Sequence, residues 1–263
     1  MFQSESKYDI NVAILREYKP YLHKLTLCRA IRKKGFETEI VPKGSVNDDK
    51  LDNNISRARA KIFEYASCNE WQWFSTFTLD SKKYNRNDLE KFRKDFSLFI
   101  RRYNKKSGLQ VKYLVIPETH KDGAWHMHGL LMGLPDEHIR LFTLQEKLPT
   151  YIREKLSEGQ QVYDWGAYRD KFGYTNLEPI RNLEACSKYV TKYISKSIAT
   201  DIKATGAHLY YNSQGLKTSK VIAKGQLNCE LNCPDYENDW VKVKWIKDLD
   251  ENKIILENLV IPY

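Results

Sequence analysis

The 263-residue chain has no long hydrophobic run and few of the signatures that mark membrane or secreted proteins. No segment approaches the roughly 20 consecutive apolar residues that a membrane-spanning helix requires. The first residues, Met1 to Lys7, lack the apolar centre of a signal peptide. The five cysteines are scattered and lack the paired spacing of a zinc module. These absences predict a cytoplasmic protein with free thiols and no membrane partner.

A further absence concerns nucleotide hydrolysis, because the chain contains no Gly-x-x-x-x-Gly-Lys-Ser/Thr loop. A built-in helicase motor is therefore not expected. What the chain does contain is positive charge, with 43 Lys and Arg against 34 Asp and Glu, a formal net charge of +9. This balance favours a polyanionic partner, and nucleic acid is a better candidate than a membrane surface because no basic amphipathic helix stands out.

The hydrophobic pattern along the middle of the chain predicts an α+β fold. Apolar spacing predicts helices near 53–65, 87–103 and 136–156 and another from Asn182 to Ile198, with strands at 71–79, 111–117 and 125–132 between them. Short strands are also expected at 208–211, 240–246 and 253–256. This order suits a single antiparallel sheet of about five strands with helices packed on it. We expect an N-terminal extension over 1–67, a central domain over 68–212 and a β-rich C-terminal extension over 213–263.

The most informative motif is Trp125-His126-Met127-His128-Gly129, which places two histidines two positions apart in an apolar run. On a strand both imidazoles project from one face and could share a metal ion. Glu118 can complete the site only if an odd number of residues joins the two strands, and we expect a three- or five-residue loop with Glu118 opposite His128. Two alternatives stay open: a structural histidine pair with a solvated Glu118, or His120 as the substitute ligand.

The second motif lies on the predicted helix after Asn182. Tyr189, Lys192, Tyr193 and Lys196 fall on one stripe of that helix, whereas Val190 and its apolar neighbours fall on another. A free phenol has a pKa of about 10 and is a poor nucleophile unless nearby cations favour the phenolate. The two lysines could supply that field. The alternative is a surface helix whose tyrosines pack against the sheet.

Basic and aromatic residues indicate where nucleic acid could bind. The basic candidates follow the predicted helix at 87–103 and are Arg93, Arg101, Arg102, Lys105 and Lys106. The aromatic candidates for stacking on unpaired bases are Trp125, Trp165, Tyr168 and Tyr174. Core positions remain an alternative for the aromatics, above all for Trp125.

From Trp71 to Ile198 the chain resembles the HUH endonucleases, and among them the rolling-circle replication initiators of single-stranded DNA phages, viruses and plasmids. The resemblance rests on Phe74–Leu79 as the first motif, His126-Met127-His128 as the histidine motif, Glu118 as the third metal ligand, and two overlapping tyrosine motifs, Tyr189–Lys192 and Tyr193–Lys196. The tyrosine pair is similar to that of the two-tyrosine phage initiators. The resemblance implies an RRM-like antiparallel sheet.

The resemblance also implies a reaction. Mg²⁺ or Mn²⁺ at Glu118, His126 and His128 would polarise a phosphate of single-stranded origin DNA, including a hairpin form. One tyrosine would attack and leave a 5′-phosphotyrosine and a free 3′-hydroxyl. A host helicase and polymerase in the bacterial cytoplasm would be partners. Alternatives are an HUH transposase or mobilisation relaxase, or a non-catalytic sequence-specific DNA-binding protein.

Overall fold

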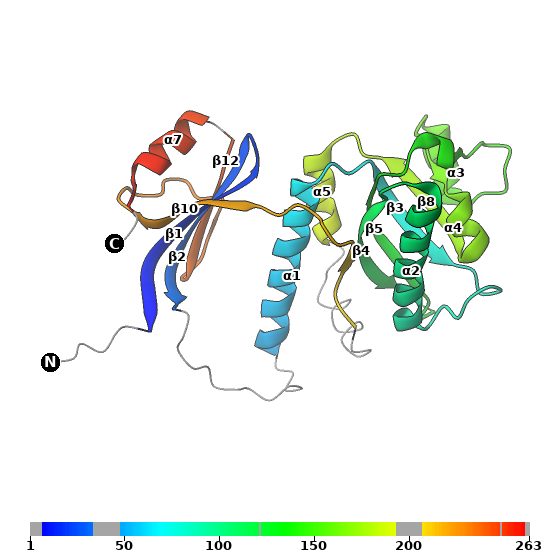
Figure 1. Cartoon of the computed structure of the whole chain (residues 1–263), viewed down its shortest axis with the longest axis horizontal. Coiled ribbons are helices and arrows are strands. Elements are labelled where there is room, and N and C mark those ends of the chain that lie inside the picture. Colours follow the sequence, from blue (N-terminus) through cyan, green and yellow to red (C-terminus); the bar gives the residue numbers. More distant parts are fainter. Residues whose placement is uncertain (1–6, 34–47, 121, 193–206, 248, 261–263) are drawn as a thin grey trace. The chain divides into compact units, whose positions relative to one another are not determined.

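The chain forms two compact units in the computed structural model, which describes residues 7–33, 48–120, 122–192, 207–247 and 249–260 (Figure 1). One unit combines residues 1–45 with 218–263, and the other comprises residues 46–217. The two ends of the chain thus contribute to the same unit.

The larger unit is built on a seven-stranded antiparallel sheet with strand order β6-β7-β8-β3-β5-β4-β9. Its strands are β3 (Trp73–Leu79), β4 (Lys112–Thr119), β5 (Trp125–Met132), β6 (Arg140–Leu141), β7 (Tyr163–Asp164), β8 (Gly173–Pro179) and β9 (Tyr211–Asn212). Its helices are α1 (Asp48–Cys68), α2 (Leu89–Ser107), α3 (Thr150–Ser157), α4 (Gly166–Lys171) and α5 (Leu183–Lys192), with a 3-10 turn η1 (Asp136–His138).

Helices cover both faces of this sheet because its central strands are apolar on both sides. On one face, the aromatic side of α2 and the buried residues of α4 pack against β3, β4 and β5, with Phe77 and Phe96 in contact near the centre. On the other face, α1 and α5 pack against Leu114, Ile116 and Leu130. We call this second face the α1/α5 face (Figure 1).

Strand β4 is only partly paired on its outer side. Its short neighbour β9 pairs with Leu114 and Val115 alone. Within the described part of the chain, the half of β4 that carries Pro117 and Glu118 therefore forms an edge of the sheet. Proline lacks an amide hydrogen and is tolerated at such an edge. The end of β4 is thus left open beside the α1/α5 face.

The smaller unit is a six-stranded sheet with strand order β11-β12-β2-β1-β10-β13. Its elements are β1 (Tyr8–Lys19), β2 (Leu22–Arg32), β10 (Lys220–Leu227), β11 (Tyr236–Glu237), β12 (Val241–Ile246), α7 (Leu249–Glu257) and β13 (Leu259–Val260). Leu15, Leu25, Ile246 and Ile255 meet in its core. N-terminal and C-terminal strands are paired in this sheet, since β1 pairs with β10 and β2 pairs with β12.

The α+β class and the antiparallel pairing agree with the prediction, but the single five-stranded sheet is wrong. The chain has two sheets, of six and seven strands. The second sheet was missed because its strands come from the two ends of the chain, and a hydrophobic pattern does not reveal which distant strands pair. The predicted domain boundaries after residues 67 and 212 remain a prediction, since a compact unit need not fold independently.

Two predicted elements are also wrong. The helix expected over 136–156 is replaced by η1, the short strand β6 and the helix α3. Pro149 precedes α3 and has an extended backbone, which begins a new helix and does not continue an old one. The strand expected over 253–256 lies within α7, because a short apolar run is compatible with either kind of element.

Candidate metal and tyrosine site

The candidate metal ligands are brought together by the β4–β5 hairpin. The last pair of the ladder is Thr119 with Trp125, so five residues, 120–124, connect the strands. This confirms the expected odd loop. The exact pairing differs from the prediction, because Glu118 lies opposite His126, and His128 lies opposite Ile116. Both pairings keep the three side chains on one face, since a shift of two residues preserves the side on which a residue projects.

The three side chains converge on a small volume. The Nε2 atoms of His126 and His128 each lie 3.1 Å from Oε2 of Glu118. One ligand atom from each of the three residues lies within 4.8 Å of the others. His126 is buried, whereas Glu118 and His128 are partly exposed. His120 is close as well, with its ring centroid 4.0 Å from that of His126, but it lies outside this group.

The donor set fits a divalent cation. Two ligand atoms that lie about 2.1 Å from an ion and at right angles to each other are roughly 3.0 Å apart. The two histidine–glutamate distances match that spacing. Two imidazoles with one carboxylate also leave room for oxygen ligands around the ion. The identity of a metal does not follow from this geometry.

The electrostatics of the group keep the carboxylate charged. Hydrogen bonds from His126 and then from His128 lower the pKa of Glu118 to about 2, against the opposing effect of burial. On the other side of His128, Thr76 of β3 lies directly opposite in the ladder, and its Oγ1 is 3.0 Å from Nδ1 of the imidazole. The hydroxyl thus holds one ring nitrogen while the other faces Glu118.

Close approach of the two strands beside the ligands depends on Gly129. A Cβ atom at this position would lie 2.0 Å from the carbonyl oxygen of Leu114. Only glycine therefore lets β5 lie this close to β4 immediately after His128.

The candidate nucleophile Tyr189 lies on α5, over the same face of the sheet. Asn182 caps this helix as predicted, because its Oδ1 accepts a hydrogen bond from the amide of Ala185 at 2.9 Å. Val190 is fully buried and Tyr189 is 48% exposed, so the helix turns its apolar side to the sheet and leaves the phenol accessible. Lys192 ends the described part of α5 and is exposed. Tyr193 and Lys196 lie outside the described residues.

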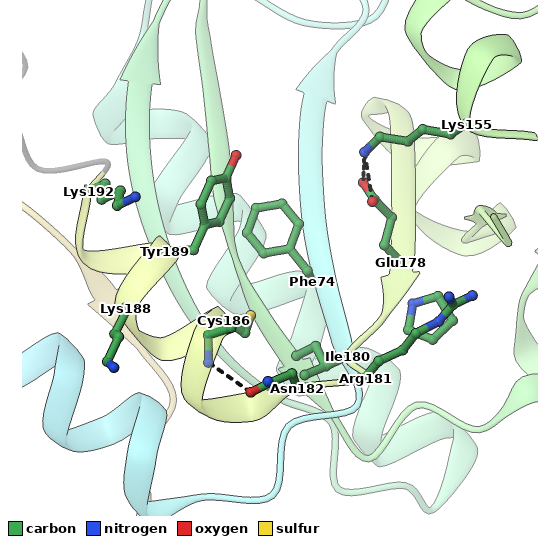
Figure 2. A pocket seen from close by; sticks show the side chains of 12 residues that line it. Phe74, Lys155, Glu178, Ile180, Arg181, Asn182, Cys186, Lys188, Tyr189 and Lys192 are labelled. Atoms are coloured by element: carbon green, nitrogen blue, oxygen red, sulfur yellow. Dashed lines mark hydrogen bonds and ion pairs between the residues drawn. The ribbon is translucent and has the colours of Figure 1, made fainter. Parts of the chain in front are cut away.

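Phe74 of β3 connects the tyrosine with the metal ligands. Its ring meets Tyr189 edge to face, with centroids 5.6 Å apart. The same ring stacks beside His128 at a centroid distance of 6.3 Å. Figure 2 shows the Tyr189 and Phe74 rings side by side above the sheet. One side chain therefore contacts both halves of the site.

A pocket opens beside Tyr189, between α5 and the end of β8 (Figure 2). Its apolar floor includes Phe74, and exposed cations such as Arg181 and Lys192 lie on its rim. Among the described residues that line it, the one carboxylate is that of Glu178, whose two oxygens each lie 2.7 Å from Nζ of Lys155. The pocket is therefore suited to an anionic ligand with an apolar part.

The predicted DNA-binding cations lie on α2, which packs on the sheet face opposite to Glu118, His126 and His128. Arg101, Arg102 and Lys105 are exposed along the second half of α2. Arg93 lies nearer the start of the helix, pairs with Glu90 at 2.5 Å, and stacks over Tyr211 of β9 with its guanidinium carbon 5.4 Å from the ring centroid. Of these cations, Arg93 is thus the one that reaches the β9 edge of the sheet.

Two predicted stacking residues, Trp165 and Tyr168, cannot contact a base, so their assignment to DNA binding is wrong. Both side chains are fully buried. Trp165 packs against Phe99 at 5.2 Å, and Tyr168 packs against Phe77 at 5.1 Å. Trp125 is also a core residue at 5% exposure, whereas Tyr174 is 61% exposed and remains available.

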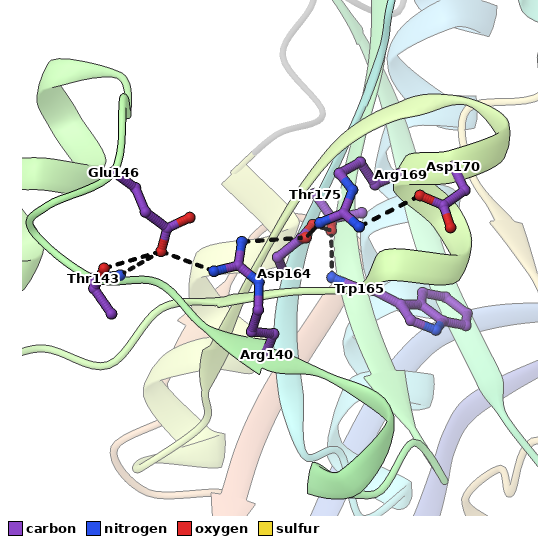
Figure 3. Close-up of polar contacts among 8 residues, drawn as sticks. All are labelled: Arg140, Thr143, Glu146, Asp164, Trp165, Arg169, Asp170 and Thr175. Carbon is purple, nitrogen blue, oxygen red and sulfur yellow. Dashed lines mark hydrogen bonds and ion pairs between the residues drawn. The ribbon is translucent and has the colours of Figure 1, made fainter.

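The burial of Trp165 is fixed by a polar cluster around Asp164 (Figure 3). The buried carboxylate accepts hydrogen bonds from Arg169 and, at 3.1 Å, from the Thr175 hydroxyl. Arg140 lies 3.8 Å away and reaches on to Glu146 at 2.8 Å. The Trp165 amide donates to Thr175 Oγ1 at 2.8 Å. These contacts fasten α4 to β8 and turn the indole into the core.

Sequence reasoning included Thr76 and Phe74 in a strand motif but gave neither a separate role. Their contacts with His128 arise from the β3–β5 pairing, which the motif does not specify. The basic residues Arg57 and Lys61 of α1 were assigned no site. The i, i+4 spacing was the available signal for that pair.

Comparison with protein families finds one match. Residues 72–198 match the family described as "Replication-associated protein ORF2". The matched range contains Glu118, His126, His128 and Tyr189. Comparison with curated proteins and comparison with solved structures found no significant match. Within the described residues, no helix is long and apolar enough to cross a membrane. The family match indicates a protein that takes part in DNA replication.

Proposed function

We propose that this chain initiates rolling-circle DNA replication by nicking and rejoining a single strand of origin DNA. The observation that carries the proposal is the link through Phe74, which contacts both the Tyr189 ring and His128 of the candidate metal group. The match to a replication-associated family supports the same biological process.

Glu118, His126 and His128 would hold Mg²⁺ or Mn²⁺. When bound, such an ion supplies charge stabilisation to a phosphate oxygen during displacement at phosphorus. The contribution of the protein is to keep Glu118 ionised, through the lowered pKa of its carboxyl group, and to fix the direction of the His128 ring through Thr76.

Tyr189 is the proposed nucleophile. Its phenol oxygen forms a bond to phosphorus, the bond from phosphorus to the 3′ oxygen breaks, and the proton lost by the phenol balances the one gained by the departing 3′-hydroxyl. The products are a 5′-phosphotyrosine and a DNA end that can prime synthesis. Lys192, three residues further on α5, would favour the developing phenolate and the phosphate charge.

A second cleavage ends a replication round in this proposal. Tyr193 with Lys196 would cut the regenerated origin while Tyr189 still holds the first end, so a 3′-hydroxyl could attack the phosphotyrosine and release a circle. Which tyrosine acts first is left to experiment. Duplex unwinding and synthesis would come from a host helicase and polymerase, with a hairpin as one form of the substrate.

The test needs no known origin sequence. A pool of random-sequence single strands, labelled at the 3′ end, is incubated with the protein and Mn²⁺, boiled in SDS and separated on a denaturing gel. Because the 5′-phosphate side of the nick stays on the tyrosine, the 3′ label should migrate with the protein. A 5′ label should appear only in a shortened free strand. Sequencing the bound DNA would identify the cleavage site.

Matched variants separate the alternatives. Tyr189→Phe and Tyr193→Phe together should abolish the adduct, and Glu118→Gln should reduce it strongly. A protein that binds the pool sequence-specifically but yields no adduct with any label would be a non-catalytic DNA-binding protein. Cleavage in which only one tyrosine is ever needed would instead favour an HUH transposase or mobilisation relaxase.

A further inference from the structure

A second groove lies at the open β9 edge of the larger unit, away from Glu118 and the histidines. Its lining comes from three places: α1 contributes Asn54, Arg57 and Lys61, α2 contributes Arg93 and Ser97, and the β9 segment contributes residues 208–212. The cavity has a volume of about 760 Å³. It is not part of the site described above.

Each helix presents one polar stripe to this groove. Asn54, Arg57 and Lys61 are spaced by three and four residues, so they lie on one side of α1. Arg93 and Ser97 are spaced by four and lie on one side of α2. The inward side of α1 packs on the α1/α5 face, and that of α2 packs on the opposite face. The two stripes therefore flank the sheet edge from opposite sides.

The chemistry of the lining fits phosphate groups. Arginine, lysine, serine, asparagine and tyrosine side chains make most protein contacts to the DNA backbone. No carboxylate is among the described residues that line this groove. Lys61 and Arg93 do pair with Glu64 at 2.6 Å and Glu90 at 2.5 Å. Such partly exposed pairs contribute little energy, so they hold the cations in place without preventing phosphate contact.

The aromatic residues of the groove argue against stacking with unpaired bases. Tyr113 and Tyr211 are only 7% and 9% exposed. Tyr211 is further covered by the Arg93 guanidinium. Proteins that hold single strands rely on exposed aromatic faces. A lining of phosphate-binding groups over buried rings instead suits a ligand whose bases are already paired.

We propose that this groove binds the sugar–phosphate backbone of double-stranded DNA beside the cleaved single strand. The inference rests on the proposed function and extends it by a duplex contact. Asn212 pairs with Leu114 on β4, and Glu118 lies four residues further along that strand, roughly 14 Å away. At about 3.4 Å for each step, a duplex covers this length in roughly four base pairs. The groove would hold the duplex next to the nick.

The experiment measures duplex binding separately from cleavage. The full chain carrying Tyr189→Phe is titrated in EDTA against a fluorescent duplex and against a single strand of the same length, between about 50 and 200 mM NaCl. For the duplex, each lost phosphate contact reduces the slope of log K against log salt by about 0.9. Arg57→Ala with Lys61→Ala should therefore lower the slope by about 1.8, and Arg93→Ala should remove about 0.9 more.

The matched control is Arg101→Ala with Lys105→Ala, which removes the same charge at the same spacing from the second half of α2. It should leave the duplex slope unchanged. Equal losses from both pairs would show that binding follows net charge, and an unchanged slope in the Arg57/Lys61 variant would refute the groove directly. Arg57→Gln with Lys61→Gln, checked by thermal unfolding, guards against a folding defect.

The outcome is distinguishable from that of the adduct test. Loss of duplex binding in the groove variants of a protein that never forms an adduct would support the groove and overturn the proposed nicking activity. A normal adduct with unchanged duplex binding in those variants would do the reverse.

Discussion

At the scale of single residues, the direction of one imidazole is the most consequential detail. His128 has Thr76 Oγ1 on its Nδ1 side and Glu118 on its Nε2 side. Residues that orient a ligand in this way commonly change metal affinity by about 10- to 100-fold when they are removed. The ring alone cannot choose which nitrogen faces the ion.

We therefore expect Thr76→Val to weaken Mn²⁺ binding by about 10- to 100-fold, measured by isothermal titration calorimetry. Valine keeps the branched shape on the strand but loses the hydroxyl. Thr76→Ser, which retains the hydroxyl, should stay close to the parent. Equal affinities for the valine and serine variants would show that Thr76 does not orient the ring.

The pH dependence of metal binding follows from the charge on Glu118. Its pKa of about 2 keeps the carboxylate ionised from about pH 5 to 8, so only the imidazoles have to lose protons in that range. Mn²⁺ affinity should rise with pH, and Glu118→Gln should bind more weakly with the same direction of dependence. A glutamine variant without pH dependence would assign the proton to Glu118.

The lowered pKa of Glu118 has the same sign in folding. Because the carboxyl group loses its proton more readily in the folded chain, its contacts with the imidazoles stabilise the protein above the ordinary pKa of about 4.3. That contribution disappears as the pH falls toward about 2.

At the scale of elements, the site depends on how α5 is held over β3. The helix is fastened by buried Val190, and its tyrosine rests edge to face on Phe74. Displacement of a reacting group by about 1 Å can reduce a rate by about 100-fold. The packing of one strand residue should therefore control the reaction without touching the ion.

We expect Phe74→Leu to lower the rate of adduct formation by up to about 100-fold while Mn²⁺ affinity changes little. Leucine preserves an apolar contact but cannot support the phenol in the same position. Single-turnover kinetics would give the rate, and calorimetry would give the affinity. A parallel loss of both quantities would mean that Phe74 serves the histidines and not the tyrosine.

Sequence alone reached the parts of the site that depend on parity and periodicity. The period of two in strands places Glu118 with the histidines for any odd loop, and the helical period exposes Tyr189 and buries Val190. It could not choose which histidine lies opposite Glu118, because loops of three and five residues satisfy the same parity. Trp165 was misassigned because Asp164, Thr175 and Arg140 bury it through contacts between distant segments.

At the scale of the whole molecule, the smaller unit is one sheet woven from both ends of the chain. Val12 of β1 lies opposite Gln226 of β10, and Cys28 of β2 lies opposite Val241 of β12. Removing either end therefore leaves the other with unpaired strand edges. Such edges expose amide and carbonyl groups that can pair with other chains.

This arrangement predicts an asymmetric response to truncation. Residues 46–217 alone should fold and keep Mn²⁺ affinity close to that of the full chain, because Glu118, His126 and His128 all lie within that unit. Deletion of 1–45 alone should do worse than deletion of both ends, since β10 and β12 lose their partners while remaining attached. Size-exclusion chromatography and Mn²⁺ titration of the three proteins would check the order. A well-behaved monomer after deletion of 1–45 alone would mean that the C-terminal strands form a stable sheet without β1 and β2.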